Sequence, residues 1–243
     1  MIKSTSINSL VKYSYFLLVM FIYFLFIFID LSNKHTGSYY SILLKYISIL
    51  IFFLTSLLIG KKGNSLIDTR LLKSALFFTL CADTCLLILN YFKLGIFFFC
   101  IVQILYIIRH KLLYHLDIRI DNLFIYIILL IILSLILNII LPETVDSQLY
   151  KIAIIYAILL TTSLLVALRC KGLIACGLIL FFLCDINVAL SYLIHSYSIY
   201  IFDIPLRFIT SFLVWIFYFP SQLLLALSGF KNFNLLWNLT NYS

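Results

Sequence analysis

The sequence predicts an all-α, polytopic membrane bundle of about eight transmembrane helices that forms one domain over residues 1–243. Of its 243 residues, 65% are hydrophobic and only 11% are charged. A soluble domain cannot bury this much apolar surface, and no segment is polar enough to form a separate soluble domain. Long apolar runs recur along the whole chain and approach the roughly 20 residues that a helix needs to cross a bilayer.

Short polar connections divide these runs into eight expected spans. The first run has no A-x-A-like cleavage site after it, so we expect a retained span rather than a secretory signal. Pro142 and the polar run after it end the fifth span. When the sequence is aligned with itself so that Asp83 matches Asp185, the third span matches the seventh. This indicates a possible 4+4 repeat, in which two halves of four helices each have the same topology. The spans lie near residues 13–29, 40–59, 71–90, 94–108, 122–141, 151–168, 173–194 and 206–229.

Lysine and arginine residues predict the orientation of these spans. Twelve lie at the chain ends and in the even connections, and four lie in the odd connections. Positive charge is retained on the cytoplasmic side of a membrane, so both termini are predicted to be cytoplasmic. The net charge of +8 is explained by this loop basicity, and nucleic acid is not an expected partner.

Two aspartates, Asp83 and Asp185, lie in the middle of apolar runs and at the same distance into their spans. Both are 12 positions from the cytoplasmic start of the span, which is about 18 Å of helix. A charged group at bilayer depth is costly, so an ionisable residue there is a candidate functional residue. The structural alternative is an interhelical hydrogen bond between two protonated acids. We favour a functional site, because two acids at one depth are an expensive way to join helices.

Other polar side chains occupy the middle and outer parts of the predicted spans, where a cavity open toward the outer leaflet would collect them. For each one there is a structural alternative: a lysine near the interface can extend to it, and amides and tyrosines can join helices by hydrogen bonds. The candidates for substrate binding are Lys45, Gln103, Tyr106, Tyr156, Tyr218 and Gln222.

Metal and cofactor chemistry is not expected. None of the six cysteines forms a CxxC pair, and most lie in apolar runs as packing residues. The histidines His35, His110, His115 and His195 are expected in loops or at interfaces, without HxxxH spacing. No glycine-rich phosphate-binding loop is present.

These residues resemble the motifs of the YhhN-like integral-membrane lysoplasmalogenases from the second span to the last. Lys45 in LLKYISIL is similar to the family's Lys-Pro, and Asp83 in ADTCLLIL to its Gly-Asp. QILY, with Gln103 and Tyr106, stands where the family has His-x-x-Tyr. The remaining matches are Tyr156 in KIAIIYAIL, Asp185 in FFLCDINVALSYL, and the closing Tyr-x-x-x-Gln with Tyr218 and Gln222 in YFPSQLLLALS.

Four positions depart from the family pattern. Tyr46 replaces the proline after the lysine, Ala82 replaces a glycine and Cys184 replaces a serine. Gln103 replaces the histidine of the fourth span, which bears on activity if that histidine moves a proton.

The resemblance implies hydrolysis of the vinyl ether bond of a lysoplasmalogen, a lysophospholipid, without a cofactor. This chemistry needs one protonated acid, which protonates a vinyl carbon, and one anionic group facing the resulting oxocarbenium ion. Asp83 and Asp185 are the expected catalytic pair. Two alternatives remain open: a proton-coupled transporter that uses both acids as proton carriers, and a non-catalytic lipid-binding protein.

Overall fold

A computed structural model describes residues 2–34, 36–60, 63–114, 147–170, 172–193, 199–201 and 204–231. Within these ranges, seven helices are long and apolar enough to cross a membrane. The prediction of an all-α, multi-pass membrane bundle is confirmed. The predicted fifth span, 122–141, lies outside the described residues.

Most of the predicted spans match helices to within a few residues. The largest differences are in the first helix, which begins at residue 2 rather than 13 and continues past residue 29, and in the fourth, which continues past residue 108. A short hairpin of β1 (Tyr200–Ile201) and β2 (Ile204–Pro205) precedes the last helix. The helices are α1 (Ile2–Asn33), α2 (Tyr39–Leu57), α3 (Leu66–Asp83), the π-helix η2 (Thr84–Ile88), α4 (Phe92–Tyr114), α6 (Ser147–Cys170), α7 (Gly172–Leu193) and α8 (Leu206–Leu227).

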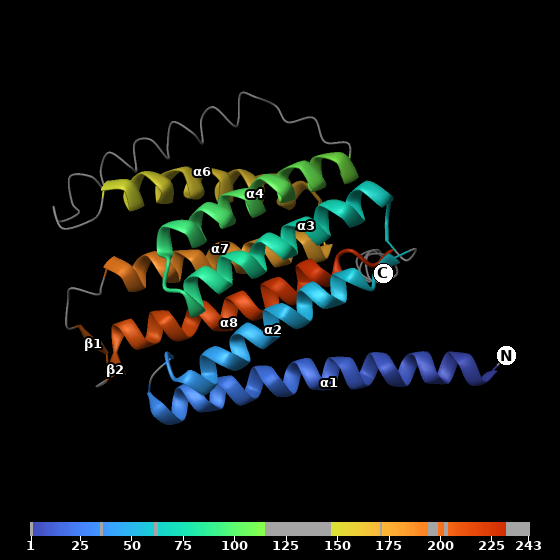
Figure 1. The fold of residues 1–243 in the computed structure, drawn as a ribbon, viewed down its shortest axis with the longest axis horizontal. Helices are drawn as coiled ribbons and strands as arrows, with labels where there is room; N and C mark the ends of the chain where they lie inside the picture. The colour runs from blue at the N-terminus through green and yellow to red at the C-terminus, as the bar shows by residue number, and fades with distance from the viewer. Residues whose placement is uncertain are drawn as a thin grey trace.

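Six of the helices form a closed ring. Each packs against the next in the order α2, α3, α4, α6, α7 and α8, and α8 closes the ring against α2 (Figure 1). In this order α3 lies opposite α7, and α4 lies opposite α8. Helix α1 lies outside the ring against α2, and its Tyr23 stacks on Phe219 of α8 with ring centroids 4.5 Å apart.

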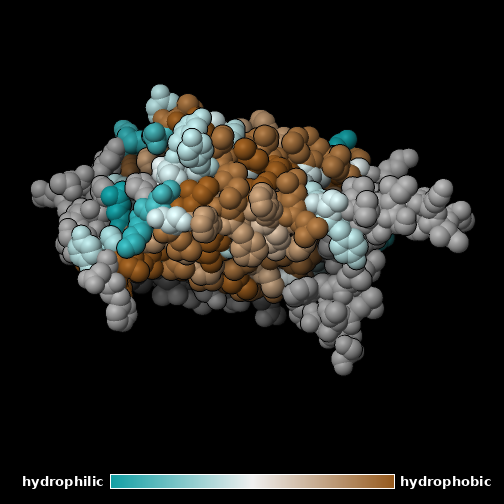
Figure 2. Space-filling model, turned by 90° about the horizontal axis from the view of Figure 1, so that it is seen from below, coloured by the Kyte–Doolittle hydropathy of each residue, from teal (hydrophilic) through white to brown (hydrophobic). Residues whose placement is uncertain are grey.

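The outer surface has the character expected of a lipid-facing bundle. Figure 2 shows hydrophobic side chains over the middle of one face and hydrophilic residues toward the ends. Phe21, Phe24 and Phe28 of α1 are more than 60% exposed, which is stable only against lipid or another apolar surface.

One end of the bundle carries most of its described basic side chains, and we call it the basic end. It is the end where α1 and α3 begin and where α4 and α8 finish. Its cytoplasmic location remains a prediction from the charge distribution. The described basic residues at or near this end include Arg70, Lys73, Arg109, Lys111, Arg169 and Lys231.

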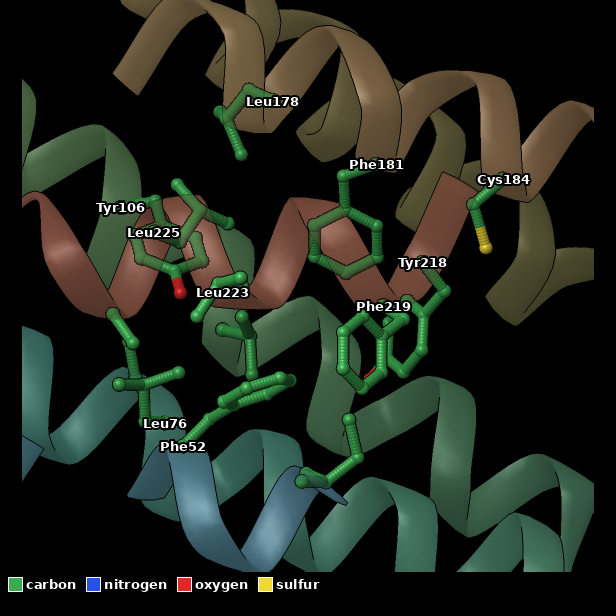
Figure 3. Packing of buried hydrophobic residues seen from close by; sticks show 14 of the residues in the cluster. Phe52, Leu76, Tyr106, Leu178, Phe181, Cys184, Tyr218, Phe219, Leu223 and Leu225 are labelled. Atoms are coloured by element: carbon green, nitrogen blue, oxygen red, sulfur yellow. The ribbon is translucent and has the colours of Figure 1, made fainter. Parts of the chain in front are cut away.

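Aromatic rings and small residues fill the interior of the ring. Phe219 of α8 contacts Phe52 of α2 with centroids 5.1 Å apart (Figure 3). Phe219 also contacts Phe26 of α1 with centroids 5.8 Å apart. Helices α7 and α8 approach closely at Gly177, where an added Cβ would lie 2.9 Å from the Leu225 Cγ. A larger residue at position 177 would displace Leu225 or separate the helices, and small residues are common at such approaches between membrane helices.

The prediction that all the histidines lie in loops or at interfaces is wrong for His110. It is fully buried inside α4, and its ring stacks on Tyr106 with centroids 5.6 Å apart. The cause of the error is the predicted end of the fourth span at residue 108, six residues before α4 finishes. The other three histidines lie outside the described residues.

Candidate active site

Each of the two aspartates accepts a hydrogen bond from a tyrosine on a neighbouring helix. Asp83, the last residue of α3, is buried, and the Tyr218 hydroxyl of α8 donates to its Oδ2 over 2.6 Å. Asp185 of α7 is half-buried, and the Tyr156 hydroxyl of α6 donates to its Oδ2 over 2.5 Å. In the described part of the chain, the Oδ1 atom of neither acid has a hydrogen bond, so each acid keeps one oxygen for a proton, water or substrate.

The two acid–tyrosine pairs share one interior, because α3 and α7 face each other across the ring. The carboxyl groups are close enough to interact electrostatically. The Phe99 ring of α4 lies 6.1 Å from the Tyr156 ring and 6.4 Å from the Tyr218 ring, so it bridges the pairs. We call Asp83, Asp185, Tyr156 and Tyr218 the acid centre.

Phe181 and Cys184 of α7 line the same region. The Phe181 ring is 5.7 Å from the Tyr218 ring (Figure 3). It is 5.8 Å from the Phe99 ring. Cys184 is buried and interacts electrostatically with both acids. Apolar side chains therefore line this part of the acid centre, and their low polarity strengthens the interactions between its charges.

The backbone changes from an α-helix to a π-helix directly after Asp83. The π-helix η2 begins at Thr84, whose hydroxyl donates to the Leu80 carbonyl over 2.7 Å. Tyr46 of α2 reaches the same hydroxyl at 3.2 Å. Tyr46 is the residue that replaces the family's proline, and here it contacts the turn that carries Asp83. Short π-helices are frequent at functional sites, where they set the direction of a side chain.

Lys45 lies in a separate buried cluster on the side of the bundle away from the basic end. Its Nζ forms an ion pair with Asp30 Oδ2 over 2.7 Å and donates to the Thr36 carbonyl over 2.8 Å. The same nitrogen lies 5.0 Å from the Trp215 ring centroid. Trp215 in turn contacts the ring of Tyr218 with centroids 5.4 Å apart. Lys45 is therefore linked to the acid centre through these aromatic rings rather than by contact with Asp83.

Sequence reasoning missed Asp30, which lies one position beyond the predicted end of the first span. It is fully buried in α1 and also accepts a hydrogen bond from the Ser41 hydroxyl over 2.5 Å. The signal was available: Asp30 follows Phe26 by one helical turn, and Lys45 lies in the next helix at the same end. An acid and a lysine facing each other across a helical hairpin indicate an ion pair.

The remaining predicted residues, Gln103, Tyr106 and Gln222, extend from the acid centre toward the basic end. All three are fully buried. Gln103 lies beside the Tyr156 hydroxyl, yet neither of its amide atoms is in hydrogen-bonding geometry with a described residue. The Gln222 amide and the Tyr106 hydroxyl likewise have no partner in the described ranges.

A buried ion pair at the basic end was also missed. The Arg109 Nε donates to Asp68 Oδ1 over 2.6 Å, and the Arg109 Nη1 donates to the Ser228 hydroxyl over 2.9 Å. This cluster joins the first turn of α3, the end of α4 and the residue after α8. Asp68 itself is fixed by Ser65, which caps α3 by accepting from the Asp68 amide over 3.0 Å.

One of the three comparisons with known proteins gives a match. No curated protein and no solved structure matches the chain. The model of the YhhN family matches residues 40–229, from the beginning of α2 to the end of α8. This range contains all eight predicted site residues, whereas Asp30 and α1 lie outside it. Because the match covers most of the chain, the protein belongs to the YhhN family.

Proposed function

We propose that the protein hydrolyses the vinyl ether bond of lysoplasmalogens and releases a fatty aldehyde and a glycerophospho-headgroup. The observation that supports this function best is the acid centre, in which two carboxyl groups face one apolar interior and each is oriented by a tyrosine. The YhhN family is linked to lysoplasmalogenase activity, and the matched range includes both acids.

The reaction divides its work between two carboxyl groups. The protonated acid donates its proton to the vinyl carbon remote from the ether oxygen, and the carbon bonded to that oxygen becomes an oxocarbenium ion. The second carboxyl group, as an anion, stabilises this cation. Glycosidases use two carboxylates for a similar oxocarbenium-like state.

Water completes the reaction. It adds to the oxocarbenium carbon and loses a proton to the anionic carboxylate, which yields a hemiacetal. The second carboxyl group then donates this proton to the ether oxygen. The first carboxylate takes the proton of the hemiacetal hydroxyl, and the hemiacetal breaks into an aldehyde and an alcohol. The sum is one vinyl ether and one water converted to one aldehyde and one alcohol, with both carboxyl groups restored. The pair titrates as a unit, so either aspartate can begin as the acid.

The tyrosines and the apolar walls have separate tasks in this proposal. The Tyr156 and Tyr218 hydroxyls hold one oxygen of each carboxyl group and leave the other oxygen toward the substrate. Phe99 and Phe181 exclude bulk water and fit the hydrocarbon chain next to the vinyl ether. The substrate-binding roles of Lys45, Gln103, Tyr106 and Gln222 are part of the same proposal.

The test is aldehyde release from a lysoplasmalogen by the purified protein, with Asp83→Asn and Asp185→Asn as the variants. Both variants are expected to lose roughly 100-fold or more in kcat, because each removes one half of the acid–base pair. The matched control is Thr79→Val. Thr79 lies one turn before Asp83, but its hydroxyl donates to the Ala75 carbonyl, so this variant is expected to keep its activity. Aldehyde release that survives both Asp→Asn changes would eliminate the mechanism.

Liposomes distinguish the two alternatives. A proton-coupled transporter would move protons with a solute and release no aldehyde, whereas a non-catalytic protein would bind the lipid without flux or turnover. Both results would contradict the hydrolase proposal.

A further inference from the structure

A column of buried polar side chains connects the acid centre with the basic end. Gln103, Tyr106 and His110 of α4 lie at spacings of three and four residues and therefore share one face of the helix. Gln222 of α8 lies one turn from Tyr218 in the same direction. We call these four residues the polar column. All four are fully buried.

None of the side chains in the polar column has a hydrogen-bond partner among the described residues. The unpaired atoms are both amide atoms of Gln103 and Gln222, the Tyr106 hydroxyl and both ring nitrogens of His110. Buried polar groups are paired in nearly all native proteins, and water supplies the partner where protein does not. Four buried, unpaired polar side chains between the acid centre and the basic end therefore indicate a hydrated site.

The position of the column gives it a direction. It begins at Gln103, one turn from Phe99 and beside the Tyr156 hydroxyl of the acid centre. It ends at His110, next to Arg109 and its ion pair with Asp68. The distance along α4 from Gln103 to His110 is about 10 Å, which a file of a few water molecules can cover.

The other side of the acid centre is different. The buried charges there, Lys45 and Asp30, pair with each other, and Lys45 packs over the ring of Trp215. Helix α4 and helix α8 lie on opposite sides of the ring, so the polar column faces the centre of the bundle rather than lipid.

We propose that the polar column binds a file of water molecules that supplies the acid centre from the basic end of the bundle. Gln103 and Gln222, each with donor and acceptor atoms, hold the water nearest the acids. Tyr106 and His110 hold the water nearest the basic end. The use of this water as a reactant rests on the proposed hydrolysis, but the hydration itself does not. The sequence led us to expect access from the outer leaflet, and the column points to the other side.

Cysteine labelling in sealed vesicles tests the path and its direction. The variants are Gln103→Cys and its neighbour Ile104→Cys, in a background with the six native cysteines replaced. Ile104 lies at the same depth, but its side chain is 43% exposed on the outer face of the bundle. An impermeant, water-soluble methanethiosulfonate is added to one side or the other, and intact mass reports the modified fraction.

Gln103→Cys is expected to react about tenfold or more faster than Ile104→Cys when the reagent is at the basic end, because hydrocarbon excludes water from the Ile104 position. Equal and slow reaction of the two variants from both sides would overturn the proposal, and faster reaction of Gln103→Cys from the opposite side would overturn its direction.

Radiolytic hydroxyl labelling of the protein with its native cysteines provides a second readout, which does not depend on the cysteine-free background folding. Tyr106 and His110 are expected to be oxidised faster than Phe52, an equally buried aromatic residue outside the column. The variant Gln103→Leu/Gln222→Leu is expected to lose this labelling. Labelling of Tyr106 no faster than Phe52 would refute the water file. Neither readout needs substrate, so failure of the proposed hydrolysis and failure of the water file are distinguishable.

Discussion

At the scale of single residues, the acids depend on the phenols that hold them. Tyr218 fixes Asp83 and Tyr156 fixes Asp185, through hydrogen bonds of 2.6 and 2.5 Å. A hydrogen bond from a preorganised donor in an apolar site contributes more to catalysis than the same bond in water. The tyrosines therefore act as part of the catalytic unit rather than as interhelical links alone.

Replacing either phenol with phenylalanine tests this role. Tyr218→Phe and Tyr156→Phe are each expected to reduce kcat for aldehyde release by roughly 100-fold. Each is also expected to cost about 1–3 kcal/mol of unfolding free energy, since a buried carboxyl group loses its partner. Tyr23→Phe is the control, because its hydroxyl makes only a 3.4 Å contact with the Ile216 carbonyl, outside the acid centre. Full activity in both acid-centre variants would show that the phenols only join helices.

Gln103 is the residue where this chain departs most from its family in a chemical sense. It is buried beside the Tyr156 hydroxyl and has no hydrogen-bond partner in the described ranges. An imidazole at this position could exchange a proton with water near Asp185, which an amide cannot do. Gln103→His is therefore expected to increase kcat. Gln103→Leu is the control, because leucine removes all hydrogen bonding by the side chain at position 103. Equal kcat values for Gln103→His and the unaltered protein would show that residue 103 takes no part in proton transfer.

At the scale of helices, α1 contributes the acidic residue Asp30, which lies outside the range that the model of the YhhN family matches. Asp30 of α1 pairs with Lys45 of α2, and both side chains are fully buried. Removing one partner of a buried ion pair leaves the other charge without compensation, whereas removing both is much less costly. The pair therefore fixes α1 against the ring and holds Lys45 over Trp215.

A double-mutant cycle measures this pairing. Lys45→Met is expected to cost about 3–5 kcal/mol of stability, and Lys45→Met/Asp30→Leu is expected to recover most of that loss. Thermal unfolding in detergent provides the measurement, and additive losses would contradict the pairing. The proposed contact of Lys45 with substrate predicts in addition a higher KM for the double variant, and an unchanged KM would exclude it.

The contact between α7 and α8 at Gly177 provides another test at this scale. The Cβ of Gly177→Ala would lie 2.9 Å from the Leu225 Cγ, so the helices must separate or Leu225 must shift. The expected loss of unfolding free energy is about 1–3 kcal/mol, as for other overpacked interiors. Adding Leu225→Ala should relieve the overlap, and a Gly177→Ala variant as stable as the unaltered protein would show that the contact tolerates a methyl group.

At the scale of the whole molecule, the sequence was informative about what crosses the membrane and less informative about how the helices face each other. Apolar runs and polar connections located seven helices, most of them to within a few residues, because the bilayer enforces length and composition. The continuation of α1 to Asp30 and of α4 to His110 was missed, because both residues look like interfacial polar groups when their partners are unknown. The order of the ring and the rotation of each helix depend on long-range packing, so the two acid–tyrosine pairs could not be predicted.

The most direct test of the central claim is isotopic analysis of the aldehyde released in D₂O. Protonation of the vinyl carbon by a carboxyl group of the acid centre transfers one solvent-derived hydrogen to the carbon next to the carbonyl. We predict an aldehyde with a single deuterium at that carbon, formed by the unaltered protein and by Thr79→Val but not by Asp83→Asn or Asp185→Asn. An aldehyde without deuterium at that carbon, or a labelled aldehyde from both aspartate variants, would contradict the account.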